Sequence, residues 1–170
     1  MGIKVAVTDA CIFIDLYDLG LTYSFFNLEL EVHTTSTVLN ELYPEQQQIL
    51  KAYQSVARLT VHNLQEQDFI EIHSEKYSKS LSEADKSVLH ICNKIDACIL
   101  SSDKILRNYA KNKSIECHGM IWIFDKFVET LVLTQKEAAN KLTQLVATNF
   151  IFQNNQKLVE EIEKRLKIWS

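Results

Sequence analysis

Short apolar runs rich in β-branched residues alternate with longer helical stretches, and this alternation limits the fold more than any other feature of the chain. The runs lie at residues 3–8, 31–33, 59–61, 97–101 and 115–117. Each run is too short for a helix, so the pattern predicts buried strands. Because strands that alternate with helices form a parallel sheet covered by helices, we expect an α/β domain with a mostly parallel sheet.

Capping signals mark where the intervening helices begin. The four hydroxyl residues at 34–37 offer N-caps for a helix that carries Val38, Leu39 and Leu42. Pro44 suits the first turn of the next helix, which we expect to end near residue 57. Further helices are predicted over residues 66–79, 82–93 and 103–112.

The chain is predicted to be helical from residue 120 onward. Thr134 and Glu137 form a capping box at the start of one helix. The final helix carries an apolar stripe at Leu158, Val159, Ile162, Leu166 and Trp169. We expect residues 131–170 to be a helical C-terminal extension that packs on a domain formed by residues 1–130.

Composition excludes several classes of protein. The net charge of −4, from 22 acidic and 18 basic residues, is not that of a wholly basic nucleic-acid binder. Three glycines and one proline leave no glycine-rich phosphate loop. The four cysteines lack the spacing of zinc ligands, which favours buried thiols in a reducing compartment. Because neither a leader peptide nor a run of about 20 apolar residues is visible, we expect a cytoplasmic protein with no membrane segment.

The tetrapeptide Asp-Ala-Cys-Ile occurs twice, but its two aspartates lie at opposite ends of predicted strands. Asp9 follows the first strand, whereas Asp96 precedes the fourth, and Asp103 is the acid that follows the fourth strand. Parallel sheets bind ligands beyond the carboxyl ends of their strands, which places Asp9 and Asp103 at the ligand-binding edge. Both residues also suit the N-cap of the helix that follows, and their spacing does not separate the two roles.

Two further acids lie on predicted helices. Ser82 and Asp85 have the spacing of a capping box, but Asp85 also aligns with the apolar residues Leu89 and Cys92. Glu41 lies at the border of the buried face of its helix and is equally compatible with a solvent-exposed acid. If the four carboxylates converge, their repulsion calls for a divalent cation, and Mg²⁺ and Mn²⁺ prefer carboxylate and water oxygens. A cation in such a site can promote the attack of water on a phosphodiester.

Five segments follow one another in a recognisable order, namely VTDACIFIDL, TTSTVLNEL, LSEADKSVLHIC, ILSSDKILRNYA and IECHGMIWIFDKF. In their order and local sequence they resemble the PIN-domain family, the nuclease fold of VapC-like bacterial toxins. The resemblance spans residues 3–130, and the family's four acids correspond to Asp9, Glu41, Asp85 and Asp103. It implies a three-layer fold with a central, mostly parallel sheet flanked by helices.

The resemblance also implies an Mg²⁺- or Mn²⁺-dependent endoribonuclease whose four acids bind the metal and whose products carry a 5′-phosphate and a 3′-hydroxyl. It further implies a toxin with a cognate antitoxin, and homodimers are common in the family. The chain departs from the family where Ala10 follows the first aspartate and where Ser101 and Ser102 precede the fourth. We expect Ser102 to orient Asp103 through its hydroxyl, whereas Ala10 has no such group.

Basic residues flank the expected site. Lys104, Arg107 and Lys111 are expected to hold RNA phosphates, although a solvated helix face explains them equally well. None of the five histidines has an acid or a nucleophile at a recognisable spacing. Two alternatives stay open, a non-catalytic interaction module and a nuclease that acts on DNA. A phosphatase of the haloacid dehalogenase type is disfavoured, because that chemistry needs an acid where Cys11 stands.

Overall fold

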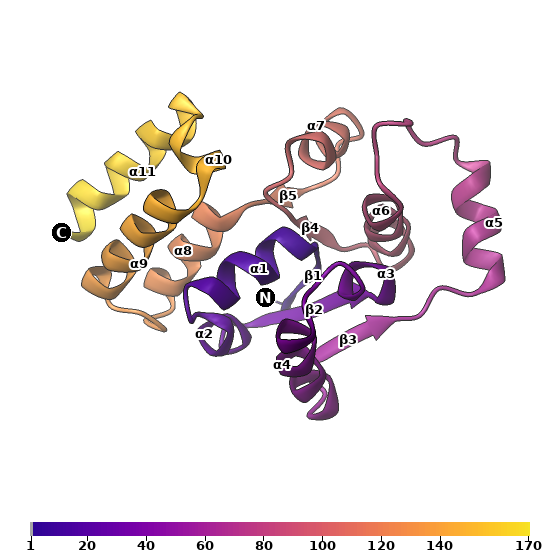
Figure 1. Ribbon diagram of the computed structural model, residues 1–170, viewed down its shortest axis with the longest axis horizontal. Helices are drawn as coiled ribbons and strands as arrows, with labels where there is room; N and C mark the ends of the chain where they lie inside the picture. The colour runs from indigo at the N-terminus through magenta and orange to yellow at the C-terminus, as the bar shows by residue number, and fades with distance from the viewer. Residues whose placement is uncertain (1) are drawn as a thin grey trace. The chain divides into compact units, whose positions relative to one another are not determined.

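The computed structural model describes residues 2–170 and contains a five-stranded sheet in which every neighbouring pair of strands is parallel (Figure 1). The strands lie in the order β3-β2-β1-β4-β5. Their bounds are β1 Lys4–Thr8, β2 Leu30–Thr35, β3 Leu59–His62, β4 Cys98–Leu100 and β5 Cys117–His118. All five predicted strands are present, and the sheet that was expected to be mostly parallel is parallel throughout.

The chain divides into two compact units, of which the first contains the sheet. This unit comprises the residues up to Ile14 together with Glu29–Met120. Its helices are the first part of α1 (Ala10–Asp18), α3 (Ser36–Leu39), α4 (Pro44–Ser55), α5 (Glu66–Ser74), α6 (Glu83–Ile95) and α7 (Lys104–Asn112). The helix α6 packs against β1, β2 and β4. Its buried residues Val88, Leu89 and Cys92 therefore form part of the core over the central strands.

The second unit comprises Asp15–Leu28 and Ile121–Ser170. Its helices are the end of α1, α2 (Thr22–Phe26), most of α8 (Met120–Glu129), α9 (Gln135–Thr148), α10 (Phe150–Gln153) and α11 (Gln156–Trp169). The predicted capping box of Thr134 and Glu137 starts α9, and α11 packs on α9 and α10. No helix in the described part of the chain is long and apolar enough to cross a membrane. The domain boundary expected near residue 130 stays a prediction.

Several helices end where the backbone enters the left-handed region, among them α5 and α6. The helix predicted over residues 66–79 ends already at Ser74, and Lys76, with a φ of 53°, is incompatible with a continued right-handed helix. Asp96 is the C-cap of α6 and also has a φ of 53°. Asp96 therefore ends a helix on the amino-terminal side of β4, as its position in the sequence predicts.

The strand order reverses between β1 and β4, which makes this pair the switch point of the sheet. The strands β2 and β3 continue on one side of β1, and β5 continues beyond β4 on the other. Thr8 pairs with Leu100 at the carboxyl ends of the two strands. The backbone N–H of Asp9 then donates to the carbonyl of Leu100 at 2.9 Å. Because chain connections leave a switch point toward opposite faces, a crevice for ligands forms outside it.

Candidate functional site

Asp9 lies at the switch point, directly after β1 and before α1. The residue is buried, with 5% of its surface exposed. Its Oδ1 accepts the backbone N–H of Ala10 at 2.8 Å, and its Oδ2 accepts the hydroxyl of Ser101 at 3.0 Å. One carboxylate oxygen therefore satisfies the start of α1, while a serine that follows the neighbouring strand β4 fixes the other.

Ser101 connects the two aspartates that follow strands. Its hydroxyl donates to Asp9 and accepts the backbone N–H of Asp103 at 3.0 Å. Asp103 is the N-cap of α7, where its Oδ1 accepts the N–H of Leu106 at 2.8 Å. The capping interpretation of Asp103 is confirmed. The cap uses only Oδ1 of Asp103, and no hydrogen bond among residues 2–170 is donated to its Oδ2.

Ser102 does not make the contact that was expected of it. Its hydroxyl oxygen is buried and has no hydrogen-bond partner among the described residues. Ser101 takes the expected role instead, because consecutive side chains in extended backbone point to opposite sides and only one of the two serines can face Asp9. The thiol of Cys11 lies beside Ser101, with its Sγ 3.6 Å from the serine Oγ and 3.7 Å from Oδ2 of Asp9.

Asp85 lies in the first turn of α6. It forms the predicted capping box, in which the backbone N–H of Ser82 donates to Oδ2 of Asp85 at 2.9 Å. In return, the backbone N–H of Asp85 donates to the Ser82 hydroxyl at 3.1 Å. Asp85 is only 9% exposed. This burial agrees with the alignment of Asp85 on the apolar face of the helix. Asp85 therefore both caps α6 and faces inward.

Glu41 lies in the turn between α3 and α4, and not within a helix as predicted. The helix α3 ends at Leu39, two residues before Glu41. The entry to α3 is fixed by Thr35, whose hydroxyl oxygen accepts the N–H of Val38 at 3.1 Å and lies 2.8 Å from the hydroxyl of Ser87 on α6. This contact ties the turn that carries Glu41 to the helix that carries Asp85. Glu41 itself is exposed.

The four acids interact through their charges. Glu41 is exposed as a residue, but partial burial of its carboxyl group raises its pKa, and the charges of Asp9, Asp85 and Asp103 raise it further. Burial likewise raises the pKa of Asp9, with the charges of Asp85 and Asp103 acting in the same direction. The pKa of Asp85 is raised by burial and by the charge of Asp103. Carboxylates that raise one another's pKa share one poorly solvated region, where a divalent cation would favour their charged forms.

Arg107 braces the end of β4. Its Nη1 donates to the backbone carbonyl of Ser101 at 3.0 Å, and the side chain is half-buried. Gly119 provides the space for this contact, because an added Cβ at that position would lie 2.5 Å from Nη1. Lys104 and Lys111 of the same helix are exposed. The three basic residues predicted to bind substrate therefore lie on one helix, but Arg107 already has a partner in the protein.

Comparison with known proteins identifies the fold family. The family model DUF3368, a PIN domain, matches residues 5–167. The chain belongs to the PIN-domain family. The match confirms the family predicted from the sequence. Proteins of this family are generally metal-dependent nucleases. The VapC-like subtype stays a prediction.

Two solved structures are similar to this PIN domain. One is a PilT N-terminus domain protein from the archaeon Sulfolobus solfataricus, with 16% identity, a TM-score of 0.47, and coverage of 69% of this chain and 87% of the other. The second is a domain of a functionally unknown protein from Methanocaldococcus jannaschii, with 21% identity, a TM-score of 0.46, and coverage of 68% and 90%. No curated protein matches the chain.

A second group of potential metal ligands in this PIN domain lies between α5 and α6. Single ligand atoms of Asp68, Glu71 and His90 all lie within 4.8 Å of one another, which holds for no other such trio in the described chain. No three of the four acids Asp9, Glu41, Asp85 and Asp103 have ligand oxygens within this distance of one another in the described chain. Their wider spacing is consistent with the repulsion between their charges. The sequence gives no sign of this trio, because its members come from two helices and no local spacing encodes how those helices pack.

The carboxylate of Asp68 is already balanced by donors. Its Oδ2 accepts the backbone N–H of Gln65 at 2.7 Å, and its Oδ1 lies 2.8 Å from Nε2 of His90 and 3.2 Å from Nζ of Lys94. The bond from Gln65 and then the bond from His90 hold the pKa of Asp68 well below its usual range. A cation at this trio would have to displace Lys94, whereas the acids at the switch point have no such competitor among the contacts described above.

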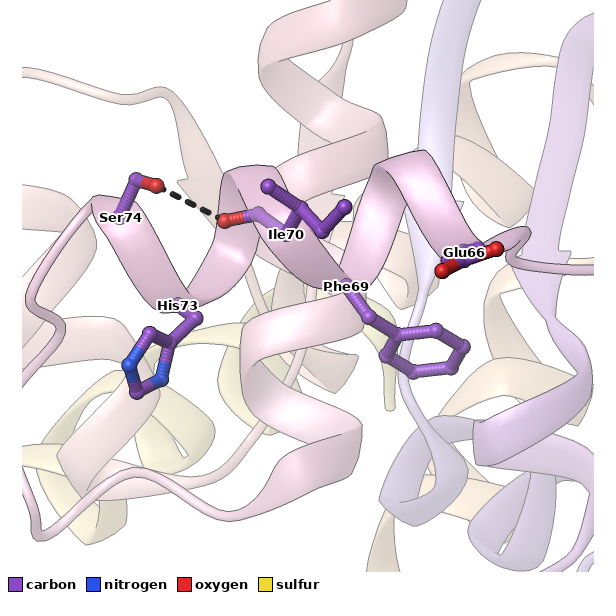
Figure 2. Close-up of a pocket in the computed structure, with 5 residues that line it drawn as sticks. All are labelled: Glu66, Phe69, Ile70, His73 and Ser74. Atoms are coloured by element: carbon purple, nitrogen blue, oxygen red, sulfur yellow. Dashed lines mark hydrogen bonds between the residues drawn. The ribbon is translucent and has the colours of Figure 1, made fainter.

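The outer face of α5 carries a hollow of about 620 Å³ (Figure 2). It is lined by Glu66, Phe69, Ile70, His73 and Ser74. Figure 2 shows the side chains of Phe69 and Ile70 projecting from the helix, and both residues are about half exposed, at 51% and 53%. All five lining residues come from one helix, so polar groups from several elements do not converge there as they do in an enzyme site. None of the predicted site residues lines this hollow.

Proposed function

We propose that this PIN domain is an Mg²⁺- or Mn²⁺-dependent endoribonuclease whose metal is held by Asp9, Glu41, Asp85 and Asp103. The observation that carries the proposal is the mutual charge interaction of these four acids beside the switch point of the sheet. Hard divalent cations prefer oxygen ligands, and the donor set consists of carboxylates alone. Membership of a family of metal-dependent nucleases supports the same role.

Each surrounding residue has a distinct task in this proposal. A bound cation would supply positive charge that stabilises the developing charge on the phosphate oxygens. Ser101 orients Asp9, because its hydroxyl donates to one carboxylate oxygen. Lys104 and Lys111 bind neighbouring phosphates, and Arg107 holds the end of β4 in place.

The proposed reaction adds water across one phosphodiester bond. The oxygen of water bonds to phosphorus, the bond between phosphorus and the 3′-oxygen breaks, and the leaving oxygen takes up a proton. The products then carry a 5′-phosphate and a 3′-hydroxyl.

A matched pair of single-stranded RNA and DNA oligomers of the same sequence tests the activity and the substrate together. Each is incubated with the purified chain in Mg²⁺, Mn²⁺ or excess EDTA, and the fragment ends are analysed. We expect cleavage of RNA in both metals, no cleavage in EDTA, and 5′-phosphate ends. If only the DNA oligomer is cleaved, the substrate is DNA and not RNA. An absence of cleavage in every condition would favour a non-catalytic interaction module.

We further propose that the nuclease is the toxin of a toxin–antitoxin pair. The sequence resemblance to VapC-like toxins supports this role. In that case an antitoxin would insert an arginine or lysine among the four acids and cover an apolar groove beside them, and the toxin would form a homodimer. Induced expression should arrest growth, whereas expression of Asp9→Asn should not. Growth that continues while a folded, RNA-cleaving protein accumulates would contradict the toxin role.

A further inference from the structure

Two basic segments meet on the first compact unit. The segment between α5 and α6 contains the exposed residues Lys76 and Lys79 and one acid, Glu75, at its start, so that positions 76–80 are basic. It runs beside α7 (Figure 1), a helix without any acidic residue. At the end of this helix Lys113 lies four residues after Tyr109 and on the same side. Lys104, Arg107 and Lys111 are five or two residues away from Tyr109 and therefore lie on the other side of α7. The chain as a whole has a net charge of −4, so this concentration of positive charge is local.

Two tyrosines join these basic segments. The rings of Tyr77 and Tyr109 are in edge contact, with their centroids 5.8 Å apart and an angle of 60° between their planes. Both residues are only half-buried. The ammonium group of Lys113 lies 5.9 Å from the centre of the Tyr109 ring. A basic surface that also presents aromatic rings is an arrangement by which proteins bind single-stranded nucleic acids.

We propose that residues 76–80 and α7 form a binding track for single-stranded nucleic acid, with Tyr109 as a stacking site for one base. This inference rests on the proposed nuclease function and assigns a path for its substrate. Lys76 and Lys79 bind phosphates, and a base replaces the ammonium group of Lys113 on the ring of Tyr109. An exposed cation–π contact is weak, so the exchange costs little. Bases in a duplex are stacked on one another and do not reach the ring, which makes a single strand the ligand.

The geometry of α7 also gives the position of the stacked base. The helix begins directly after Asp103, one of the four acids, so the track begins at the proposed metal centre. Tyr109 lies six residues after Asp103, which corresponds to about 9 Å along a helix. One strand advances about 3.4 Å per nucleotide when its bases are stacked. The rise along the axis corresponds to about two or three nucleotides, and Tyr109 also lies about 120° around the helix from Asp103. The base on Tyr109 is therefore at least that many nucleotides from the phosphate that is cleaved.

Binding measurements with the Asp9→Asn variant of the 170-residue chain in EDTA test the track without any cleavage. The probes are a fluorescently labelled six-nucleotide single-stranded RNA and an abasic RNA of the same length, followed by fluorescence anisotropy. We expect the protein to prefer the oligomer with bases, and Tyr109→Leu to weaken that oligomer's binding roughly five- to twenty-fold while leaving the abasic one unchanged. Tyr109→Phe, which keeps the ring, and Tyr23→Leu, at an exposed tyrosine on α2, should bind both oligomers as the parent protein does.

Several results would overturn the track. Equal affinity of the parent protein for the two oligomers would do so even if Tyr109→Leu failed to fold. So would unchanged base preference in a folded Tyr109→Leu protein, or tighter binding of a duplex than of the single strand. These outcomes are separable from the nuclease proposal, because cleavage by the wild-type protein is measured independently. Suppose that the wild-type protein cleaves RNA and that Tyr109→Leu keeps its preference for the oligomer with bases. The nuclease proposal would then stand, and the proposed track would be wrong.

Discussion

The hydroxyl of Ser101 donates a hydrogen bond of 3.0 Å to Oδ2 of Asp9, and this bond joins the residues that follow two adjacent strands. We predict that Ser101→Ala weakens Mn²⁺ binding or RNA cleavage roughly 10- to 100-fold, because the carboxylate loses the group that orients it. Titration calorimetry with Mn²⁺ and a cleavage assay measure the two effects.

The matched control lies next to it in the chain. The Ser102 hydroxyl has no partner among the described residues, so Ser102→Ala should bind Mn²⁺ and cleave RNA within about twofold of the wild type. An equal loss in the two variants would contradict the assignment of Ser101 as the positioning residue.

Gly119 sets the position of Arg107. In Gly119→Ala the new Cβ would lie 2.5 Å from Nη1 of Arg107, so the guanidinium group must leave the carbonyl of Ser101. We predict a folded protein with reduced RNA cleavage, and a crystal structure in which Arg107 has moved. Gly2→Ala serves as the control, because nothing lies within 4 Å of its added Cβ. Full activity with Arg107 displaced would show that its contact with Ser101 is dispensable.

Exposed lysines on α7 should make substrate binding depend on salt. If Lys104 and Lys111 each contact one phosphate of a single strand, Lys104→Gln and Lys111→Gln should each lower the slope of log K against log salt by about 0.7. Lys51→Gln, at an exposed lysine of α4, should leave the slope unchanged. Slopes that are equal in all three variants would favour a solvated face on α7 over a phosphate-binding one.

Local sequence was sufficient to predict the sheet and two of its acids. A strand followed by an acid is a local pattern, and the parallel arrangement then brings Asp9 and Asp103 to the same edge of the sheet. The capping box of Ser82 and Asp85 is local in the same way. These features were predictable because they depend only on residues within one turn or one strand.

Features that depend on packing between distant segments were not predictable. The choice between Ser101 and Ser102 depends on which side of the short strand β4 faces Asp9, and two consecutive serines give no sign of it. The pairing of Asp68 with His90 depends on how α5 lies against α6. The exposed turn at Glu41 arises because α3 stops at Leu39, although the sequence after it continues to suit a helix.

Asp15 should make stability depend on pH. Burial raises the pKa of this carboxyl, which is 8% exposed, to about 6, although Asn149 Nδ2 donates to its Oδ1 at 2.9 Å. The folded chain thus binds a proton that the unfolded chain has lost, so stability should fall as the pH rises from about 4 to about 6 and stay low above that. The contribution over this window is up to roughly 3 kcal/mol.

Asp15→Asn removes this titration and keeps an oxygen for Asn149. We predict that its free energy of unfolding exceeds that of the wild type at pH 8 and that the gain disappears near pH 4, as measured by urea denaturation. The comparison variant is Asp18→Asn, at an exposed acid of the same helix whose charge adds to the rise in the pKa of Asp15, and it should show only a smaller gain. A wild-type protein whose stability does not fall between pH 4 and pH 6 would contradict a raised pKa at Asp15.

We propose that acids at the carboxyl edge of the sheet, and not acids elsewhere, form a metal-dependent nuclease centre. Asp9→Asn and Asp96→Asn make the same chemical change in the two copies of Asp-Ala-Cys-Ile, at the switch point and at the C-cap of α6. The most direct measurement is the rate of single-stranded RNA cleavage in Mn²⁺ by both folded variants. We predict a loss of more than about 100-fold for Asp9→Asn, because a metal ligand matters more than the residue that supports it, and a nearly unchanged rate for Asp96→Asn. Equal rates for wild type and Asp9→Asn, or an equal loss in both variants, would contradict it.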